Sequence, residues 1–312
     1  MKIVFLDAKT LGQSNLDPIK KLGELIVYET TQPNQTLQRC QEADIVLTNK
    51  VVLNASTLNE LPKLKLICVT ATGTNIIDTQ TAQNLGIAVK NVAGYSTQSV
   101  AQHTLTLALN LMSRLNYYDE YCKSGKWCKS DIFTHINGGL NELDGKQWGI
   151  IGLGSIGKKT ASLAQAFGAQ ISYTSTSGKN LDDTYTQKSL YGLLETSDII
   201  SIHAPLNDKT KNIITQKELS LLKEGAILIN VGRGGIVNEN DMANTLQSKN
   251  IFFATDVLEV EPMLDDHPFL NPKIQNKLIL TPHIAWAYGN AREKLLDLVI
   301  QNIKDFIKEN QS

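Results

Sequence analysis

The stretch Lys146–Gly157, with the sequence KQWGIIGLGSIG, combines an apolar run, a glycine-rich turn and the beginning of a helical segment. Trp148–Ile151 has the composition of a buried strand, and the segment Lys158–Phe167 carries apolar residues at the spacing of one helical face, namely Ala161, Leu163, Ala164 and Phe167. A G-x-G-x-x-G turn between a strand and a helix is typical of dinucleotide binding, because free N–H groups and the dipole at the helix N-terminus attract phosphates. We therefore predict a nucleotide-binding unit here, in preference to an ordinary tight turn.

The three glycines of this turn have separate predicted roles. Gly152 makes the tight turn, Gly154 lets a pyrophosphate approach the backbone, and Gly157 lets the helix pack closely on the strand. The pattern alone is common, and the flanking strand and helix make it specific.

The composition limits the possible partners. A chain of 312 residues with 42% hydrophobic content is long enough for two domains. Thirty basic and 31 acidic side chains leave a net charge of -1, so no general field attracts nucleic acid or an anionic membrane. The opening MKIVFLDAKT reads as a strand, and no apolar run reaches the length of a membrane span. We expect a cytoplasmic protein.

The four cysteines have no C-x-x-C spacing, and we expect free thiols in a reducing compartment. No histidine pair lies near Cys122 and Cys128, so we expect no metal site.

Five short apolar runs separated by helix-length segments predict a first domain with a parallel sheet and helices on both faces. They are Ile3–Leu6, Leu25–Tyr28, Ile45–Thr48, Leu66–Thr70 and Ile87–Val89. Ligands of such sheets bind at the carboxyl ends of strands, which makes Lys50 and the turn Ala71–Thr74 candidates. A solvated lysine and a plain turn at Gly73 are the alternatives.

Two long helices are predicted outside the strand pattern. Gln98–Tyr121 reads as one helix whose middle is apolar nearly all round, so we expect it to be buried between domains or subunits. We expect Ser124–Leu140, which leads to the nucleotide-binding strand, to be an ordered loop. Asn290–Asn310 reads as an amphipathic helix that packs on the first domain, with an apolar stripe made of Leu296, Val299, Ile300, Ile303, Phe306 and Ile307.

The choice of dinucleotide depends on the end of the next predicted strand, Ile171–Thr174. An Asp or Glu roughly 20 residues past the glycines usually binds the ribose hydroxyls. This chain has Ser175–Lys179, STSGK, instead. The carboxylate that would repel a 2′-phosphate is missing, and hydroxyls and a lysine are present, so NAD and NADP both stay open.

Further apolar runs end in polar residues that suit catalysis. The runs 226–231 and 252–255 lead to Arg233 and Asp256, with Glu261 shortly after, and the run 278–280 leads to His283. If these runs are parallel strands beside the nucleotide strand, their ends converge on one edge of the sheet. We expect the active site there.

The predicted roles follow from side-chain chemistry. His283 suits general acid/base work because imidazole changes charge near neutral pH, and Glu261 would orient it. Arg233 suits two-pronged binding of a carboxylate. Asp256 would orient the nicotinamide end or the histidine, or serve as a structural cap. Surface or structural roles are the alternatives for His283 and Glu261, and structural roles are predicted for the other histidines, His103, His135, His203 and His267.

Several motifs occur in a fixed order along the chain, namely LDGK with GIIGLGSIG, HAPL at 203–206, NVGRG at 230–234, Asp256 through Glu261-Pro262, and TPH at 281–283. In these motifs the chain resembles the NAD(P)-dependent D-isomer-specific 2-hydroxyacid dehydrogenases over essentially its whole length. The segments TATGTNIID and NVAGYSTQSVAQHT are most similar to the glycerate dehydrogenase (hydroxypyruvate reductase) branch.

The resemblance implies that Arg233 binds substrate, that His283 donates and accepts the proton, and that Glu261 is its partner. It implies that Thr72 and Gly73 contact the substrate carboxylate or the nicotinamide end, and Lys50 is a further candidate for substrate binding. The cofactor-binding set that follows from the motif and the resemblance is Gly152, Gly154, Ser155, Ile156, Gly157, Ser175, Ala204, Val231, Gly232, Asp256 and Trp286.

The implied fold is α/β, with two doubly wound parallel-sheet domains. A flavodoxin-like substrate domain comprises residues 1–100 and a returning C-terminal helix at 287–312, and a Rossmann NAD(P)-binding domain spans 101–286. The resemblance also implies a homodimer built on the Rossmann domain.

Three positions bear on the resemblance. Gln102 stands where many relatives have glutamate, and Ser175 stands where NAD-specific relatives have aspartate. Glu261 argues against the related formate dehydrogenases, which pair the histidine with glutamine.

The expected reaction is reduction of a short 2-oxo acid, hydroxypyruvate first, with domain closure excluding water. The alternatives are a D-lactate dehydrogenase acting on pyruvate and a non-enzymatic NAD(H)-sensing protein like the C-terminal-binding-protein corepressors. We expect no nucleic acid or membrane partner.

Overall fold

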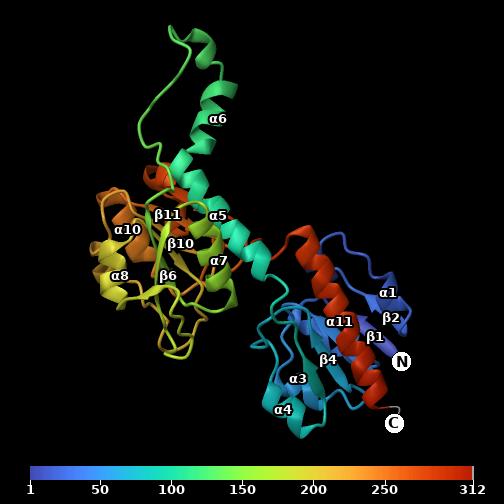
Figure 1. The fold of residues 1–312 in the computed structure, drawn as a ribbon. Helices are drawn as coiled ribbons and strands as arrows, with labels where there is room; N and C mark the ends of the chain where they lie inside the picture. Colours follow the sequence, from blue (N-terminus) through green and yellow to red (C-terminus); the bar gives the residue numbers. More distant parts are fainter. Residues whose placement is uncertain (311–312) are drawn as a thin grey trace. The chain divides into compact units, whose positions relative to one another are not determined.

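The computed structural model describes residues 1–310, and the chain forms two compact units. One unit comprises Met1–Ser96 together with the chain from Ala287 onward, and the other comprises Thr97–Trp286 (Figure 1). The second unit is therefore inserted into the sequence of the first.

The first unit contains a five-stranded parallel sheet of order β2-β1-β3-β4-β5, which is the flavodoxin-like order. The buried strands β3 and β4 consist of apolar residues and one threonine, because both faces of a parallel sheet are covered. The strands are β1 (Lys2–Phe5), β2 (Glu24–Val27), β3 (Ile45–Thr48), β4 (Leu66–Val69) and β5 (Ala88–Lys90). The helices are α1 (Asp17–Lys20), α2 (Thr36–Cys40), α3 (Ala55–Asn59), α4 (Thr79–Asn84) and α11 (Gly289–Glu309).

Helix α11 belongs to the first unit and packs against β4 (Figure 1). Its predicted apolar stripe is buried at Leu296, Val299, Ile300, Ile303 and Phe306, while Ile307 is half-buried.

The second unit contains a seven-stranded parallel sheet of order β12-β11-β10-β9-β6-β7-β8. The chain moves outward from β6 in one direction and then starts again beside it at β9, so the strand order reverses at β6. Ligands of doubly wound sheets bind at such a reversal. The strands are β6 (Gln147–Ile151), β7 (Gln170–Thr174), β8 (Thr186–Gln187), β9 (Ile199–Ile202), β10 (Ile227–Asn230), β11 (Phe252–Thr255) and β12 (Leu278–Leu280).

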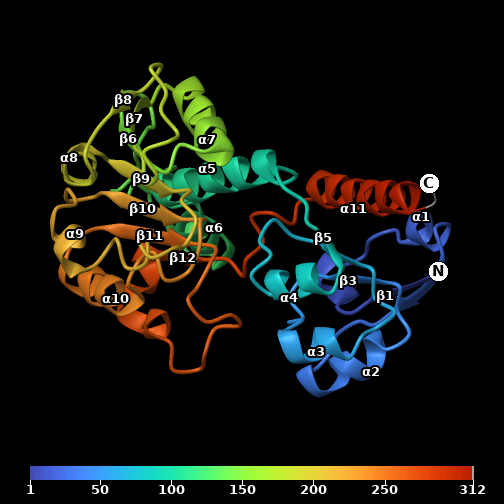
Figure 2. The same ribbon diagram turned by 90° about the horizontal axis from the view of Figure 1, so that it is seen from below.

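Alternate residues of the central strands enter two different cores. Ile200 and Leu228 pack with α8 (Leu190–Thr196), α9 (Gln216–Ser220) and α10 (Glu239–Ser248), whereas Ile199 and Ile229 pack with α5 (Thr97–Ser113) and α7 (Ser155–Ala166) (Figure 2). This two-sided burial explains why the strands are apolar at successive positions.

The predicted helix over 98–121 is wrong as a single element. Arg114 adopts a left-handed conformation with φ of 49° and divides the segment into α5 and α6 (Leu115–Lys123). Helix α5 is buried and packs on α7 inside its own unit. No residue of α6, whose sequence is LNYYDEYCK, is buried.

The structure differs from the sequence-based prediction at two further places, the end of α7 and the edge strand β8. Phe167 lies past the end of α7 and is 51% exposed, so it leaves the buried face predicted for it. The two-residue edge strand β8 is polar and carries no apolar signal that would predict it. Within residues 1–310, none of the helices combines the length and apolar character needed to cross a membrane.

Candidate active site

The glycine turn lies between β6 and α7, and each glycine has its own steric reason. Gly152 has φ of 93°, and a Cβ there would lie 2.9 Å from the nitrogen of Ala204. A Cβ on Gly157 would lie 2.3 Å from the carbonyl oxygen of Gly152, which would push α7 away from the turn. A Cβ on Gly154 would meet nothing within 4 Å. The space beside Gly154 is therefore open to a ligand.

The first turn of α7 supplies donors beside this space. The first helical hydrogen bond runs from Lys158 N–H to the oxygen of Gly154 at 2.8 Å. The N–H groups of Ser155, Ile156 and Gly157 precede it and have no acceptor within the helix. Open space, free donors and the strand reversal at β6 together fit the pyrophosphate of a dinucleotide.

A cavity of about 510 Å³ opens beside the turn, entirely within the second unit, and is lined by Gly152, Gly154, Thr176, Ser177, Lys179, Asn180, His203, Pro205, Asn207, Asp208 and Lys209. His203, for which the sequence predicts only a structural role, forms part of its wall. Its Nε2 lies 3.0 Å from Ser201 Oγ, to which Trp148 Nε1 donates at 2.9 Å. Its Nδ1 is buried without a partner among residues 1–310. Burial lowers the pKa of His203 to about 3, so the ring is neutral near pH 7.

His283 and Glu261 form a close pair. His283 Nδ1 lies 2.7 Å from Glu261 Oε2, and Glu261 Oε1 accepts a hydrogen bond from Leu258 N–H at 3.0 Å. His283 has φ of 53°, a conformation that non-glycine residues adopt when the surrounding structure holds them there. Its Nε2 makes no hydrogen bond within residues 1–310. The pair thus presents one oriented ring nitrogen for proton transfer.

Asp256 holds the loop that carries His283. Its carboxylate is 2% exposed and accepts hydrogen bonds from Thr281 Oγ1 at 2.6 Å and from the N–H groups of Ile284 and Ala285 at 2.8 Å each. The backbone N–H of His283 donates to the carbonyl oxygen of Asp256, also at 2.8 Å. The Asp256 side chain thus acts as a structural cap of the loop that carries His283, and its hydrogen bonds go to Thr281 and to backbone N–H groups.

His103 is a further member of this network. Its Nε2 lies 3.1 Å from Thr281 Oγ1 and 3.7 Å from Asp256 Oδ1. Burial lowers the pKa of His103, and the nearby Asp256 partly opposes that shift. The sequence does not indicate that His103 and Thr281 meet, since 178 positions separate them.

Arg233 lies on a turn that follows β10. Asn230 shapes this turn, because its Nδ2 donates to the oxygen of Arg233 at 2.9 Å and its Oδ1 accepts from Gly232 N–H at 3.1 Å. Arg233 is exposed, its Nη1 donates to the oxygen of Gly232, and it forms no ion pair with an acidic side chain within residues 1–310. The guanidinium is therefore available to an anionic ligand.

The turn of Arg233 packs directly on the segment that carries Glu261. A Cβ on Gly234 would lie 2.0 Å from the carbonyl carbon of Leu258, so only glycine allows this approach. Leu258 is also the residue whose N–H binds Glu261. The motif around Arg233 and the His283–Glu261 pair therefore belong to one packed structure.

The remaining cofactor-binding candidates also belong to the second unit. Ser175 directly follows β7 and accepts a hydrogen bond from Gly178 N–H at 3.0 Å. Ala204 and Val231 are buried. A Cβ added at Gly232 would lie 2.9 Å from the carbonyl oxygen of Ala204. Trp286 is half-buried and packs on the core shared with α5 and α7.

Lys50, Thr72 and Gly73 belong to the first unit, at the ends of β3 and β4. Lys50 N–H donates to Asp7 Oδ2 at 2.7 Å, and Thr72 Oγ1 donates to the oxygen of Val92 at 3.1 Å. The Asp7 carboxylate is 4% exposed, and burial raises its pKa.

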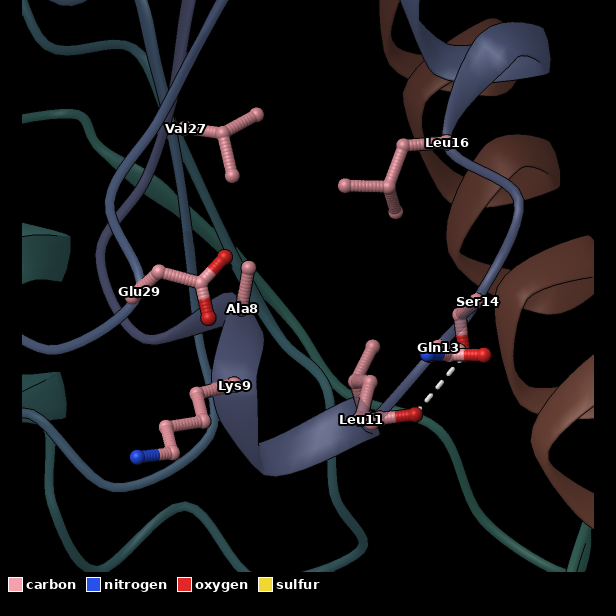
Figure 3. A pocket seen from close by; sticks show the side chains of 9 residues that line it. Ala8, Lys9, Leu11, Gln13, Ser14, Leu16, Val27 and Glu29 are labelled. Atoms are coloured by element: carbon pink, nitrogen blue, oxygen red, sulfur yellow. Dashed lines mark hydrogen bonds between the residues drawn. The ribbon is translucent and has the colours of Figure 1, made fainter.

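The first unit also contains a cavity of about 400 Å³, and none of the predicted catalytic residues line it. Figure 3 shows Leu16 and Val27 on opposite sides of it, with Lys9 and Glu29 on the same side as Val27. It is therefore a weaker candidate than the edge of the second sheet.

Residues 105–285 match the model of the D-isomer specific 2-hydroxyacid dehydrogenase NAD binding domain. The chain belongs to the D-isomer specific 2-hydroxyacid dehydrogenase family. It is thus an NAD(P)-dependent oxidoreductase with a Rossmann domain, as the sequence motifs predict. It is 35% identical to a hydroxypyruvate reductase from Blautia hydrogenotrophica over 99% of this chain and 97% of that protein.

Two solved structures share the fold over nearly their whole length. An acyclic imino acid reductase in complex with NADPH and D-Arg is 28% identical, with a TM-score of 0.86 over 99% of this chain and 98% of that one. A D-lactate dehydrogenase from Aquifex aeolicus complexed with NAD and lactic acid is 25% identical, with a TM-score of 0.83 over 100% of this chain and 96% of that one.

Proposed function

We propose that this dehydrogenase reduces short 2-oxo acids to D-2-hydroxy acids, with hydroxypyruvate as the preferred substrate. The observation that carries the proposal is the His283–Glu261 pair at 2.7 Å, in one packed structure with the turn of Arg233. Among residues 1–310 the second ring nitrogen of His283 has no hydrogen-bond partner. This arrangement supplies a proton donor and a carboxylate-binding cation at the carboxyl edge of the sheet that carries the glycine turn.

A nicotinamide cofactor held at the glycine turn would supply the hydride for the carbonyl carbon of the substrate. Glu261 fixes the ring of His283 through Nδ1, so that Nε2 donates a proton to the carbonyl oxygen. Arg233 binds the substrate carboxylate in a bidentate manner and stabilises negative charge as it develops. In the reverse direction His283 accepts the proton. Asp256 and Thr281 keep the histidine loop in place.

The choice of hydroxypyruvate is supported by the similarity to the hydroxypyruvate reductase and by the segments at 70–78 and 91–104. Pyruvate is the alternative, in view of the fold shared with the D-lactate dehydrogenase. We propose, on the family resemblance alone, that Lys50, Thr72 and Gly73 also contact the substrate, and that the cofactor-binding residues are those named from the sequence.

The test is oxidation of NADH and NADPH by the purified protein with a panel of 2-oxo acids. We expect the highest kcat/KM with hydroxypyruvate. A higher kcat/KM with pyruvate would assign the protein to D-lactate formation. Binding of cofactor without turnover of any 2-oxo acid would contradict the enzymatic proposal and favour a cofactor-sensing protein.

We also propose a homodimer formed through the second unit. Helix α6 and the segment after it, residues 115–140, form an arm that extends away from the rest of this unit (Figure 1). Residues on this arm expose large apolar side chains, which is typical of a protein interface: Trp127 at 50%, Ile132 at 63%, Phe133 at 88%, Ile136 at 74% and Leu140 at 52%.

A further inference from the structure

We propose that the cavity beside the glycine turn recognises a 2′-phosphate, and that this enzyme therefore prefers NADP(H) to NAD(H). The inference rests on the proposed function, since it concerns the adenosine end of the same dinucleotide site. The residues that carry it are Ser175, Thr176, Ser177, Lys179 and Lys209.

The position of the loop follows from strand register. Ile151, the last residue of β6, pairs with Thr174, the last residue of β7, and Gly152 N–H donates to the oxygen of Thr174 at 3.0 Å. Ser175 therefore comes directly after the strand end beside the glycine turn. In a doubly wound sheet this is where the adenosine ribose is bound.

An acidic side chain at that strand end would accept hydrogen bonds from both ribose hydroxyls and repel a 2′-phosphate. Ser175 carries no charge, and its Oγ accepts from Gly178 N–H at 3.0 Å, which closes the loop into a turn. A second such bond joins Ser177 Oγ to Lys179 N–H at 3.2 Å. The loop is thus compact and offers no carboxylate to a ribose diol.

The charges around the cavity favour an anion. Its lining residues include two lysines, Lys179 and Lys209, and one acidic residue, Asp208. The next acidic residue along the loop, Asp182, pairs with Lys158 at 2.8 Å, and hydrogen bonding to that lysine lowers the pKa of Asp182 to about 2. Its charge is therefore already compensated.

The neutral parts of the wall also suit a phosphate ester of adenosine. Thr176 and Ser177 supply hydroxyl groups, which bind phosphate oxygens as donors. The ring of His203 stays uncharged near pH 7, and Pro205 is a further uncharged lining residue. Selectivity for the phosphate thus falls to the two lysines, which act as point charges.

The test uses half-ligands that contain no nicotinamide. Binding of 2′,5′-ADP, 3′,5′-ADP and 5′-AMP to the full chain is measured by titration calorimetry. The two bisphosphates carry the same charge, so a difference between them reports a positioned site rather than general attraction. We expect 2′,5′-ADP to bind about tenfold more tightly than either of the others. Equal binding of the two isomers would overturn the proposal.

Variants assign the effect to residues. Lys179→Gln and Lys209→Gln should each weaken binding of 2′,5′-ADP by about three- to tenfold and leave 5′-AMP unchanged. Lys211→Gln removes the same charge two positions away, outside the cavity lining, and should change neither affinity. No effect of both lining variants would contradict the assignment.

Ser175→Asp should reverse the preference between NADPH and NADH, measured by quenching of protein fluorescence. Tighter binding of NADH than of NADPH by the unaltered protein would refute the inference while leaving the reductase proposal intact. Absence of binding to all of these nucleotides would instead remove the cofactor basis of the proposed function.

Discussion

His283 Nδ1 lies 2.7 Å from Glu261 Oε2, although the two residues are 22 positions apart and come from different loops. The remaining oxygen of Glu261 binds the backbone of Leu258, so the carboxylate cannot rotate freely. The pair therefore orients Nε2 of the histidine.

Glu261→Gln should lower kcat by about ten- to a hundredfold, because the amide removes the negative charge and replaces one of the two acceptor oxygens by a donor. His283→Gln should lose turnover almost completely, by about 10³-fold or more. Both are measured as NAD(P)H oxidation with hydroxypyruvate, and nucleotide affinity should stay within about twofold in each. Full activity of His283→Gln would remove the mechanism.

Asp256→Asn should reduce both stability and turnover. One carboxylate oxygen would become an amide that faces backbone N–H donors, and a buried hydrogen-bond network would be left unpaired, which costs about 2–4 kcal/mol. We expect a lower free energy of unfolding in urea and a lower kcat, since the loop of His283 loses its anchor. Unchanged values of both would show that the network is dispensable. Asp297→Asn, at an exposed position of α11, is the control.

Gly157→Ala and Gly154→Ala should fail in different ways. The Cβ on Gly157 meets the oxygen of Gly152 at 2.3 Å, so this variant should lose about 1–3 kcal/mol of stability together with nucleotide binding. The Cβ on Gly154 meets nothing within 4 Å, so that variant should keep its Tm and lose nucleotide affinity alone. Thermal unfolding and calorimetric titration distinguish the two results. A normal affinity of Gly154→Ala would place the pyrophosphate elsewhere.

His203 should make the fold sensitive to acid. Burial lowers its pKa to about 3 from an ordinary value of 6.5, so the unfolded chain binds more protons between these pH values. The stability that depends on the neutral ring is therefore present above pH 6.5 and is lost progressively as the pH falls toward 3. In His203→Gln, the free energy of unfolding should decline less between pH 6.5 and 4.5. Parallel curves for the two proteins would contradict this.

We expect the arm at residues 115–140 to form the interface between two chains. Light scattering coupled to gel filtration should give about twice the chain mass of 34.4 kDa. Replacing Phe133 and Ile136 by serine should yield the monomer without lowering the stability of the isolated chain, because both side chains are largely exposed. Leu181→Ser, an exposed apolar position elsewhere in the second unit, is the matched control. A monomeric parent protein would end the proposal.

The sequence by itself determined the α/β class, nearly all of the strands and the glycine turn. Strands buried on both faces must be apolar at successive positions, and a turn that allows no Cβ must carry glycine. Short stretches of the sequence are therefore enough to predict these features. The same holds for the motifs that contain Arg233, Glu261 and His283, since each directly follows a strand or lies on the loop after it.

The tertiary structure decided what local patterns do not contain. It broke the predicted long helix at Arg114, placed Phe167 in solvent, and gave His203 a place on the cavity wall. It also brought His103 within hydrogen-bond distance of Thr281 and packed Gly234 closely against the backbone of Leu258. Such contacts link segments that periodicity treats as independent, and only the order and register of the strands bring them within bonding distance.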